Sequence, residues 1–168
     1  MKAQKIRAAV IGSTGYGGVE LIRFLLHHPH VEITSVVSSS QAGKPIHEVF
    51  PHLTELLPLI LDDVDIPLLQ SKADVVFLAT PAGVSAELAP DLLEAGLQVI
   101  DLSGDFRIQS PEVYEKWYKL KAPAEEFLKK AVYGLSEIYA EKVKGAEFIS
   151  NPGCYPTCSF LSIYPLAK

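Results

Sequence analysis

The sequence predicts an α/β fold of the Rossmann-like, doubly wound type with a mostly parallel sheet. Short β-branched runs alternate with longer segments of helical spacing, and a glycine cluster separates the first run from the first helical segment. The chain has 168 residues, of which 48% are hydrophobic and 21% are charged. This length and composition are those of an ordinary globular domain.

Seven short aliphatic runs predict the strands. They lie between turn-forming residues, as the buried strands of a parallel sheet do. In order, they are residues 6–11, 31–37, 59–61, 75–79, 99–102, 131–133 and 147–150. Pro45, Pro51 and Pro58 interrupt the stretch around the third run, so we expect an irregular loop with a short strand there.

The segments between these runs carry helical signals. Val19, Ile22 and Leu25 recur at the spacing of one helix face. Gly96 is placed to stop a helix, and Ser110 is an expected N-cap before a proline at the first helical position. In order, the expected helices cover residues 16–28, 84–95, 111–117 and 154–168, with a short helix between the last two strands.

Composition excludes several function classes. A formal net charge of −5 leaves no excess of Lys and Arg for a phosphate backbone, so we expect no nucleic-acid partner. No apolar run has the length of a membrane span, and the start of the chain lacks a secretory signal. Cys154 and Cys158 alone form no disulfide framework, so we expect a reducing, cytoplasmic setting.

The glycine cluster is the first candidate site. Its G-x-x-G-x-x-G spacing is a variant of the dinucleotide fingerprint, in which a tight turn brings the backbone close to pyrophosphate at a helix N-terminus. The alternative is a plain turn; a P-loop would need a closing Gly-Lys-Ser/Thr that is not there. The expected cofactor-binding residues are Gly12, Ser13, Thr14, Gly15, Tyr16, Gly17 and Gly18.

The end of the second predicted strand indicates which dinucleotide binds. An NAD site usually carries Asp or Glu there, for the ribose hydroxyls. This strand ends instead in serines followed by Lys44, and hydroxyl donors with a nearby cation suit the 2′-phosphate of NADP. We therefore expect NADP(H), with Ser38 and Ser40 at the phosphate; the alternative is a solvated polar loop.

Cys154 is the second candidate site and the expected catalytic residue. It follows a predicted strand and opens a predicted helix, whose N-terminal partial charge favours a thiolate. Such a thiolate can attack an acyl phosphate and hold a thioester. The alternative is a small buried cysteine. Cys158, one turn later, is expected in the core, and no metal site is expected.

Arg107 and Asn151 are the expected substrate contacts. A guanidinium can hold a carboxylate or phosphate through two hydrogen bonds. The alternative for Arg107 is a surface ion pair with Asp105. Residues 80–83 follow the central strand and could touch the cofactor or form an ordinary turn. The histidines at 27, 28 and 30 are expected to favour the helix dipole rather than to bind metal.

Four stretches together resemble the N-acetyl-γ-glutamyl-phosphate reductase family and span nearly the whole chain. They are Gly12-Ser-Thr-Gly-Tyr-Gly-Gly-Val-Glu-Leu21, Ala42-Gly-Lys-Pro45 with Val49-Phe-Pro-His-Leu53, Asp101-Leu-Ser-Gly-Asp-Phe-Arg107, and Asn151-Pro-Gly-Cys-Tyr-Pro-Thr157. The last is the most specific. The segment Tyr133-Gly-Leu-Ser-Glu137 is also similar, with serine where proline is common.

The resemblance implies NADPH binding by the glycine loop, a nucleophilic Cys154, and reduction of an acyl phosphate to a semialdehyde in arginine biosynthesis. It also implies a homo-oligomer at full length. Alternatives are an aminoadipyl-phosphate reductase, aspartate-semialdehyde dehydrogenase, and a non-catalytic NADP-binding module with a sensor thiol.

The resemblance also implies a second domain. We expect residues 1–150 to form the NADP-binding domain and residues 151–168 to begin a truncated substrate domain. The family places its histidine acid/base in that second domain. Without general acid help worth about 10²–10⁴-fold, we expect this chain to bind NADPH but to reduce substrate poorly.

Overall fold

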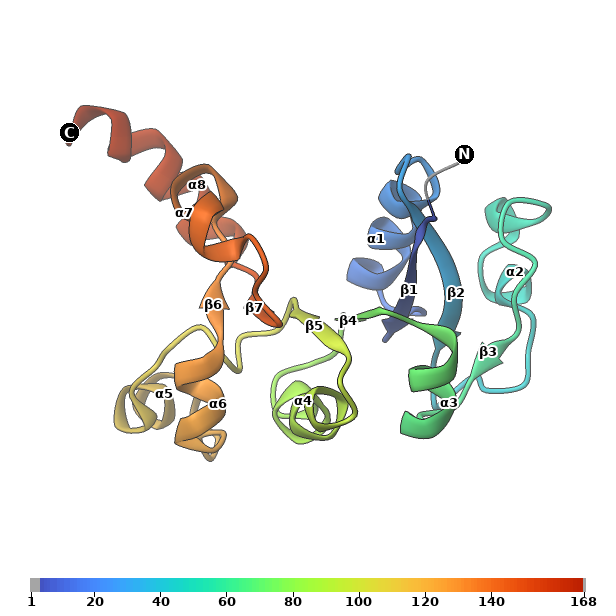
Figure 1. Cartoon of the computed structure of the whole chain (residues 1–168), viewed down its shortest axis with the longest axis horizontal. Helices are drawn as coiled ribbons and strands as arrows, with labels where there is room; N and C mark the ends of the chain where they lie inside the picture. Colours follow the sequence, from blue (N-terminus) through green and yellow to red (C-terminus); the bar gives the residue numbers. More distant parts are fainter. Residues whose placement is uncertain (1–3, 168) are drawn as a thin grey trace.

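Seven parallel strands form one sheet in the computed structural model, which describes residues 4–167 (Figure 1). The strand order is β3-β2-β1-β4-β5-β7-β6. Along the chain the strands are β1 (Ile6–Ile11), β2 (Val31–Val37), β3 (Leu61–Asp62), β4 (Val75–Leu78), β5 (Gln98–Asp101), β6 (Val132–Tyr133) and β7 (Phe148–Ser150). This confirms the doubly wound α/β class that the sequence predicts.

The chain reverses its direction across the sheet beside β1. From β1 it builds outward through β2 and β3, and then returns to place β4 on the other side of β1. In open α/β sheets the crevice at this reversal, outside the carboxyl ends of the strands, is where ligands bind. The topology therefore puts the loops after β1 and β4 at the natural binding edge.

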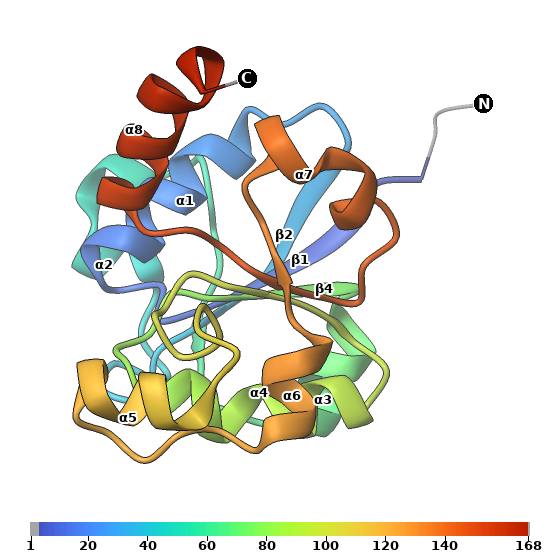
Figure 2. The ribbon, with the colours of Figure 1, turned by 90° about the vertical axis from the view of Figure 1, so that its left-hand side faces the viewer.

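Helices cover both faces of the sheet. Figure 2 shows α3, α4, α5 and α6 along one face and α1 and α7 on the other, while α8 extends away from the sheet. The helices are α1 (Tyr16–Leu26), α2 (Ile46–Val49), α3 (Ile66–Lys72), α4 (Val84–Glu94), α5 (Pro111–Tyr118), α6 (Glu125–Lys130), α7 (Ser136–Val143) and α8 (Cys154–Ile163). Two short 3₁₀ turns, η1 (Pro51–Leu53) and η2 (Tyr164–Leu166), complete the described elements.

Each face of the sheet has its own apolar core. On the α1 face, Ile22 packs with alternate strand residues such as Val10 and Val36. On the other face, Leu92 of α4 packs with the neighbours of those residues along the same strands, such as Ile11 and Val37. Side chains of successive strand residues point to opposite faces, so strands buried on both sides read as continuous apolar runs.

The structure confirms the predicted helix ends at two places. The Ser110 hydroxyl accepts a hydrogen bond from the Val113 amide at 3.3 Å and so caps α5. Gly96 follows α4 with φ +80° and donates its N–H to the carbonyl of Leu93. A residue in this left-handed conformation is the usual stop for a helix.

Other elements differ from the expectations. Helix α1 ends at Leu26, where the predicted pattern continued to residue 28. Helices α2, α3 and α6 have no counterpart among the helices that the sequence predicts. The predicted final helix becomes a 3₁₀ turn after Ile163, and its expected end at Lys168 lies outside the described residues.

Candidate active site

A cavity of about 320 Å³ lies at the carboxyl ends of β1, β2 and β4. Gly12, Gly15, Ser38 and Ser40 line it, together with residues that follow or face β4. One of these residues is Thr80. It belongs to segment 80–83, for which the sequence allows either a cofactor contact or an ordinary turn. The cavity occupies the position where a parallel sheet of this topology binds a dinucleotide.

Two positions of the glycine loop require glycine because backbone atoms lie too close for a side chain. A Cβ added to Gly12 would lie 2.3 Å from the carbonyl oxygen of Ala79, and Gly12 has φ +81°. A Cβ added to Gly18 would lie 2.3 Å from the carbonyl oxygen of Gly12. These contacts hold the loop tightly against β4 and the start of α1.

The start of α1 offers unpaired amides to an anion. The first N–H groups of a helix have no partner within it and carry a partial positive charge. Here those amides belong to Tyr16, Gly17 and Gly18. A Cβ added to Gly17 would have no neighbour within 4 Å, so this part of the loop is open to an approaching group. The Tyr16 side chain is 94% exposed.

A chain of hydroxyl groups joins the glycine loop to the end of β2. The Thr14 and Ser38 hydroxyl oxygens lie 2.9 Å apart, and those of Ser38 and Ser40 lie 3.4 Å apart. Ser13 differs from these, because its buried hydroxyl and its amide both donate to the carbonyl of Val37. Ser13 therefore fixes the loop to β2, while the other hydroxyls line or border the cavity.

Cys154 lines a second cavity, of about 690 Å³, on the other side of the glycine loop. Gly17, Arg107, Asn151 and Gly153 line the same cavity. Gly15 lines the first cavity and Gly17 the second, so one loop borders both. The cysteine and the glycine loop, far apart in sequence, therefore face a common space.

Both cysteines are exposed. For Cys154 this removes the alternative of a small buried cysteine. For Cys158 it corrects the prediction of a core residue. Helix α8 extends away from the sheet, and none of its residues is buried, so the apolar pattern of the helix does not mark a covered face.

Arg107 hydrogen-bonds to two backbone carbonyls in the wall of the cysteine cavity. Its Nε donates to the carbonyl of Asn151 at 2.8 Å, and its Nη2 donates to the carbonyl of Leu102 at 2.7 Å. The Asn151 amide N–H donates to the carbonyl of Asp101 at 2.7 Å. Arg107 and Asn151 thus come together where β5 and β7 end.

The alternative of a surface ion pair between Asp105 and Arg107 is wrong, because Asp105 is buried. Its carboxylate accepts hydrogen bonds from the amides of Gly83 and Ala86 at the start of α4, at 2.7 and 3.0 Å, and from the Tyr114 hydroxyl at 2.8 Å. Asp105 therefore caps α4 from a distant part of the chain.

A second buried acid, Asp101, is the last residue of β5. Burial raises the pKa of its carboxyl, and hydrogen bonds from Ser85 and Ser103 oppose that rise. For Tyr114, burial and then the hydrogen bond to Asp105 raise the pKa of its hydroxyl, which keeps that hydroxyl a donor. The hydrogen bonds of Asp101, Asp105 and Tyr114 support the loop between β5 and α5. None of these three residues lines the cavity of Cys154.

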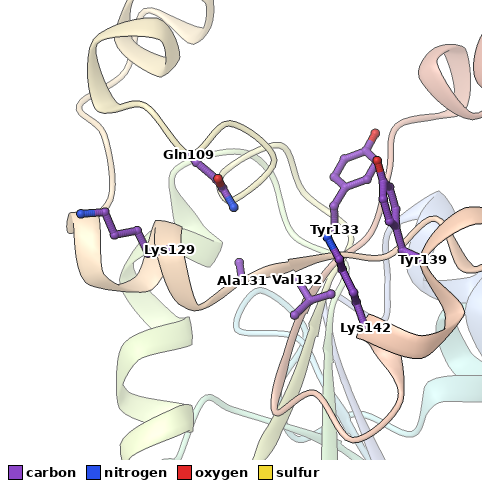
Figure 3. Close-up of a pocket in the computed structure, with 7 residues that line it drawn as sticks. All are labelled: Gln109, Lys129, Ala131, Val132, Tyr133, Tyr139 and Lys142. Carbon is purple, nitrogen blue, oxygen red and sulfur yellow. The ribbon is translucent and has the colours of Figure 1, made fainter.

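A third cavity, of about 320 Å³, lies along the outer strand β6 (Figure 3). Tyr133, Tyr139 and Lys142 gather on one side of it, and the side chain of Lys129 points away. The Lys142 ammonium lies 5.3 Å from the centre of the Tyr139 ring. None of the residues expected to bind cofactor or substrate lines this cavity, so we do not assign the active site to it.

Comparison with known proteins agrees with this geometry. Residues 7–146 match the family model described as semialdehyde dehydrogenase, NAD binding domain. The chain belongs to the semialdehyde dehydrogenase family. The matched residues include the glycine loop and the Asp101–Arg107 loop, and they end just before β7 and Cys154.

Several curated relatives share one name. The protein called N-acetyl-gamma-glutamyl-phosphate reductase in Bacillus cytotoxicus is 52% identical over 163 residues, covering 97% of this chain and 47% of that protein. The protein of the same name in a Geobacillus species is 52% identical over 160 residues, covering 95% of this chain and 46% of that protein. The chain thus spans about half the length of the curated relatives it matches.

Solved structures of semialdehyde dehydrogenases share the fold. Aspartate semialdehyde dehydrogenase II of Vibrio cholerae, in its complex with ASA, superposes with a TM-score of 0.68 at 19% identity, covering 97% of this chain and 46% of that chain. The Candida albicans aspartate semialdehyde dehydrogenase with NADP gives a TM-score of 0.64 at 21% identity, covering 97% of this chain and 47% of that chain.

In residues 4–167 of the present chain, no helix has the length and apolar character needed to cross a membrane.

Sequence reasoning missed part of the site. Val64, Val84 and Leu88 line the dinucleotide cavity, yet nothing in their local sequence marks them as ligand contacts. Thr157 lines the cysteine cavity, and its hydroxyl donates to the carbonyl of Gly153 at 2.9 Å. Thr157 could have been found, because it lies one helical turn after the glycine that precedes Cys154.

Proposed function

We propose that this chain is the dinucleotide-binding part of an NADPH-dependent N-acetyl-γ-glutamyl-phosphate reductase. The observation that carries the proposal is the common space: Cys154 and Gly17 line one cavity, and Gly15 lines the adjoining one. A dinucleotide along the glycine loop then has its reactive end near a cysteine. The name carried by the 52% identical relatives supports the choice of substrate.

The residues present fit NADP(H). The unpaired amides at the start of α1 suit a pyrophosphate, and the open space at Gly17 permits its close approach. The end of β2 presents hydroxyls and no acid, which suits a 2′-phosphate better than bare ribose hydroxyls. We assign cofactor contacts to the glycine loop and the β2 end, namely Gly12, Thr14, Gly15, Tyr16, Gly17, Gly18, Ser38 and Ser40. Ser13, which was also expected to contact the cofactor, is buried with its amide and hydroxyl bonded to Val37, so we assign it the role of holding the loop.

Ser40→Asp is expected to lower NADPH affinity by roughly ten-fold or more, because a carboxylate would repel the 2′-phosphate. NADH affinity should hold or rise, since an acid at this strand end can accept hydrogen bonds from ribose hydroxyls. Titration of nicotinamide fluorescence with each cofactor measures both constants. Retained NADH binding excludes misfolding, and an unchanged ratio of the two affinities would show that Ser40 does not face the phosphate.

Cys154 acts as the nucleophile. Its sulfur attacks the γ-carbonyl of the acyl phosphate, the C–O bond to phosphate breaks, and inorganic phosphate leaves. NADPH, when bound, supplies the hydride that reduces the resulting thioester. The thiohemiacetal on Cys154 then expels the sulfur and releases the semialdehyde. Arg107 and Asn151 line the cavity and are the proposed substrate contacts.

We place the boundary between two units at the end of β7. Residues 1–150 form the NADP-binding unit, and residues 151–168 belong to the unit that completes the substrate site. This is supported by α8, which carries exposed apolar side chains such as Phe160 and Ile163 and has no buried residue. We also propose that the whole protein is homo-oligomeric and works in the cytoplasm, where exposed thiols stay reduced.

The function is tested by incubating the chain with N-acetyl-γ-glutamyl phosphate, without NADPH, and measuring intact and peptide masses. We expect one acyl group, located on Cys154 and removed by hydroxylamine. A chain that binds NADPH but takes up no acyl group would instead be a non-catalytic dinucleotide-binding module. Uptake of an aminoadipyl phosphate in preference would reassign the substrate.

A further inference from the structure

The guanidinium of Arg107 contacts the Asn151-Pro152-Gly153 turn that precedes Cys154. Its two hydrogen bonds run to the carbonyl of Asn151, directly after β7, and to the carbonyl of Leu102, directly after β5. A guanidinium is a rigid planar fork, so two bonds from different nitrogens fix both carbonyls relative to each other. Arg107 therefore sets the relation between the two strand ends that wall the cysteine cavity.

Gly153 gives a second, independent sign of this contact. Its backbone has φ −71° and ψ 156°, an extended conformation that any residue adopts, so conformation does not require glycine there. A Cβ at this position, however, would lie 2.9 Å from Nη1 of Arg107 and 3.6 Å from its Cζ. The guanidinium occupies the space of the missing side chain, directly beside Cys154.

The loop that carries Arg107 is itself held firmly. Asp105 is buried with three hydrogen bonds, two of them from the start of α4. Between the two residues, Phe106 is buried with its ring 4.7 Å from that of Phe148 in an edge-on arrangement. An arginine on such a support can hold its partners in one geometry, because two buried residues precede it and two hydrogen bonds hold its guanidinium.

We infer that Arg107 is a positioning residue that fixes the Asn151-Pro152-Gly153 turn, and with it the direction from which Cys154 enters the cavity shared with Gly17. The inference rests on the proposed role of Cys154 as nucleophile. It goes beyond a substrate contact through charge, because Nε and Nη2 are already bonded to protein carbonyls.

Two substitutions, Arg107→Lys and Arg107→Gln, distinguish a role of Arg107 through its charge from a role in positioning the turn. Lysine keeps the positive charge but cannot bond two carbonyls through a rigid fork. If Arg107 positions the turn, Cys154 should be acylated more slowly in both variants, by on the order of 10²-fold. This is the loss expected when a reacting group is misplaced by about 1 Å. A wild-type acylation rate in Arg107→Lys with a slow Arg107→Gln would overturn the inference in favour of charge alone.

The control for these variants is Arg23→Lys, on the exposed side of α1, where the guanidinium bonds to Glu20. This variant should acylate at the wild-type rate. NADPH affinity, measured by fluorescence, should stay unchanged in the Arg107 variants, and the pH midpoint of Cys154 alkylation should stay unchanged in Arg107→Lys. A general loss of structure would change cofactor affinity as well.

A double-mutant cycle tests the contact without any substrate. Gly153→Ala should lower the thermal unfolding midpoint by roughly 3 °C or more in the wild-type background. In an Arg107→Ala background, Gly153→Ala should lower the unfolding midpoint by much less. If Arg107→Ala does not fold, Arg107→Gln serves as the background. Equal shifts in both backgrounds would refute the contact. If the wild-type chain is never acylated, the proposed function fails, and this cycle still decides whether Arg107 holds the turn.

Discussion

Replacing Cys154 by alanine is expected to abolish acylation of the chain and to lower NADPH-dependent reduction by the whole protein by on the order of 10⁴-fold or more. The loss should be this large because, in the proposed reaction, the sulfur forms and breaks a covalent bond. The other hydroxyl or thiol groups that line the cavity belong to Thr157 and Cys158. The Thr157 hydroxyl already donates to the carbonyl of Gly153, which ties it to the backbone. Acyl transfer followed by mass spectrometry measures the first effect, and the absorbance of NADPH measures the second.

Cys158→Ala is the matched control. Cys158 is also exposed and lines the same cavity, one helical turn beyond Cys154. We expect this variant to keep its acylation rate, and both variants to bind NADPH as the wild type does. Acylation that survives in Cys154→Ala and disappears in Cys158→Ala would move the nucleophile to the second cysteine.

Gly12→Ala is expected to destabilise the fold by about 3 kcal/mol or more in free energy of unfolding, the sum of overpacking and left-handed backbone strain. The added Cβ would lie 2.3 Å from the carbonyl oxygen of Ala79, and a backbone atom at the end of β4 cannot move aside as a flexible side chain can. The residue would also have to hold φ +81°. Chemical denaturation followed by circular dichroism measures the change.

Gly17→Ala is the comparison within the same loop. A Cβ at Gly17 meets nothing within 4 Å, and alanine favours the helix that begins there by up to about 1 kcal/mol. We therefore expect stability that is unchanged or higher. Similar losses for the two substitutions would mean that the loop is not held against β4 as described.

The sequence was most informative where structure depends on neighbouring residues. Strands β1 and β2 have the predicted bounds, and the Ser110 cap and the Gly96 stop lie as expected. Helix α3 was missed because it spans only Ile66–Lys72, too short for a clear apolar face. It nevertheless carried a usable signal: Asp65 accepts from the Leu68 amide at 2.9 Å, and Pro67 stands in the first turn.

The candidate site divides in the same way. The glycine loop and Cys154 are visible as short motifs, and their meeting at one cavity follows from a parallel sheet whose strand ends share an edge. The partners of Asp105 and Arg107 are not visible in this way. Asp105 reaches the Gly83 amide, and Arg107 reaches the Asn151 carbonyl 44 residues away, so both contacts exist only in the folded chain. For the same reason, periodicity placed Cys158 in a core that α8 does not form.

Protection of Cys154 by bound cofactor tests the shared space most directly. The alkylation rate of Cys154 by iodoacetamide is measured by peptide mass spectrometry with no ligand, with saturating NADP⁺, and with saturating 2′,5′-ADP, which has the phosphorylated adenosine half and no nicotinamide. If the dinucleotide runs from Ser40 past the glycine loop toward the cysteine, NADP⁺ slows alkylation and 2′,5′-ADP does not. Equal rates under all three conditions, with binding of both ligands verified by titration, would contradict a nicotinamide site beside Cys154.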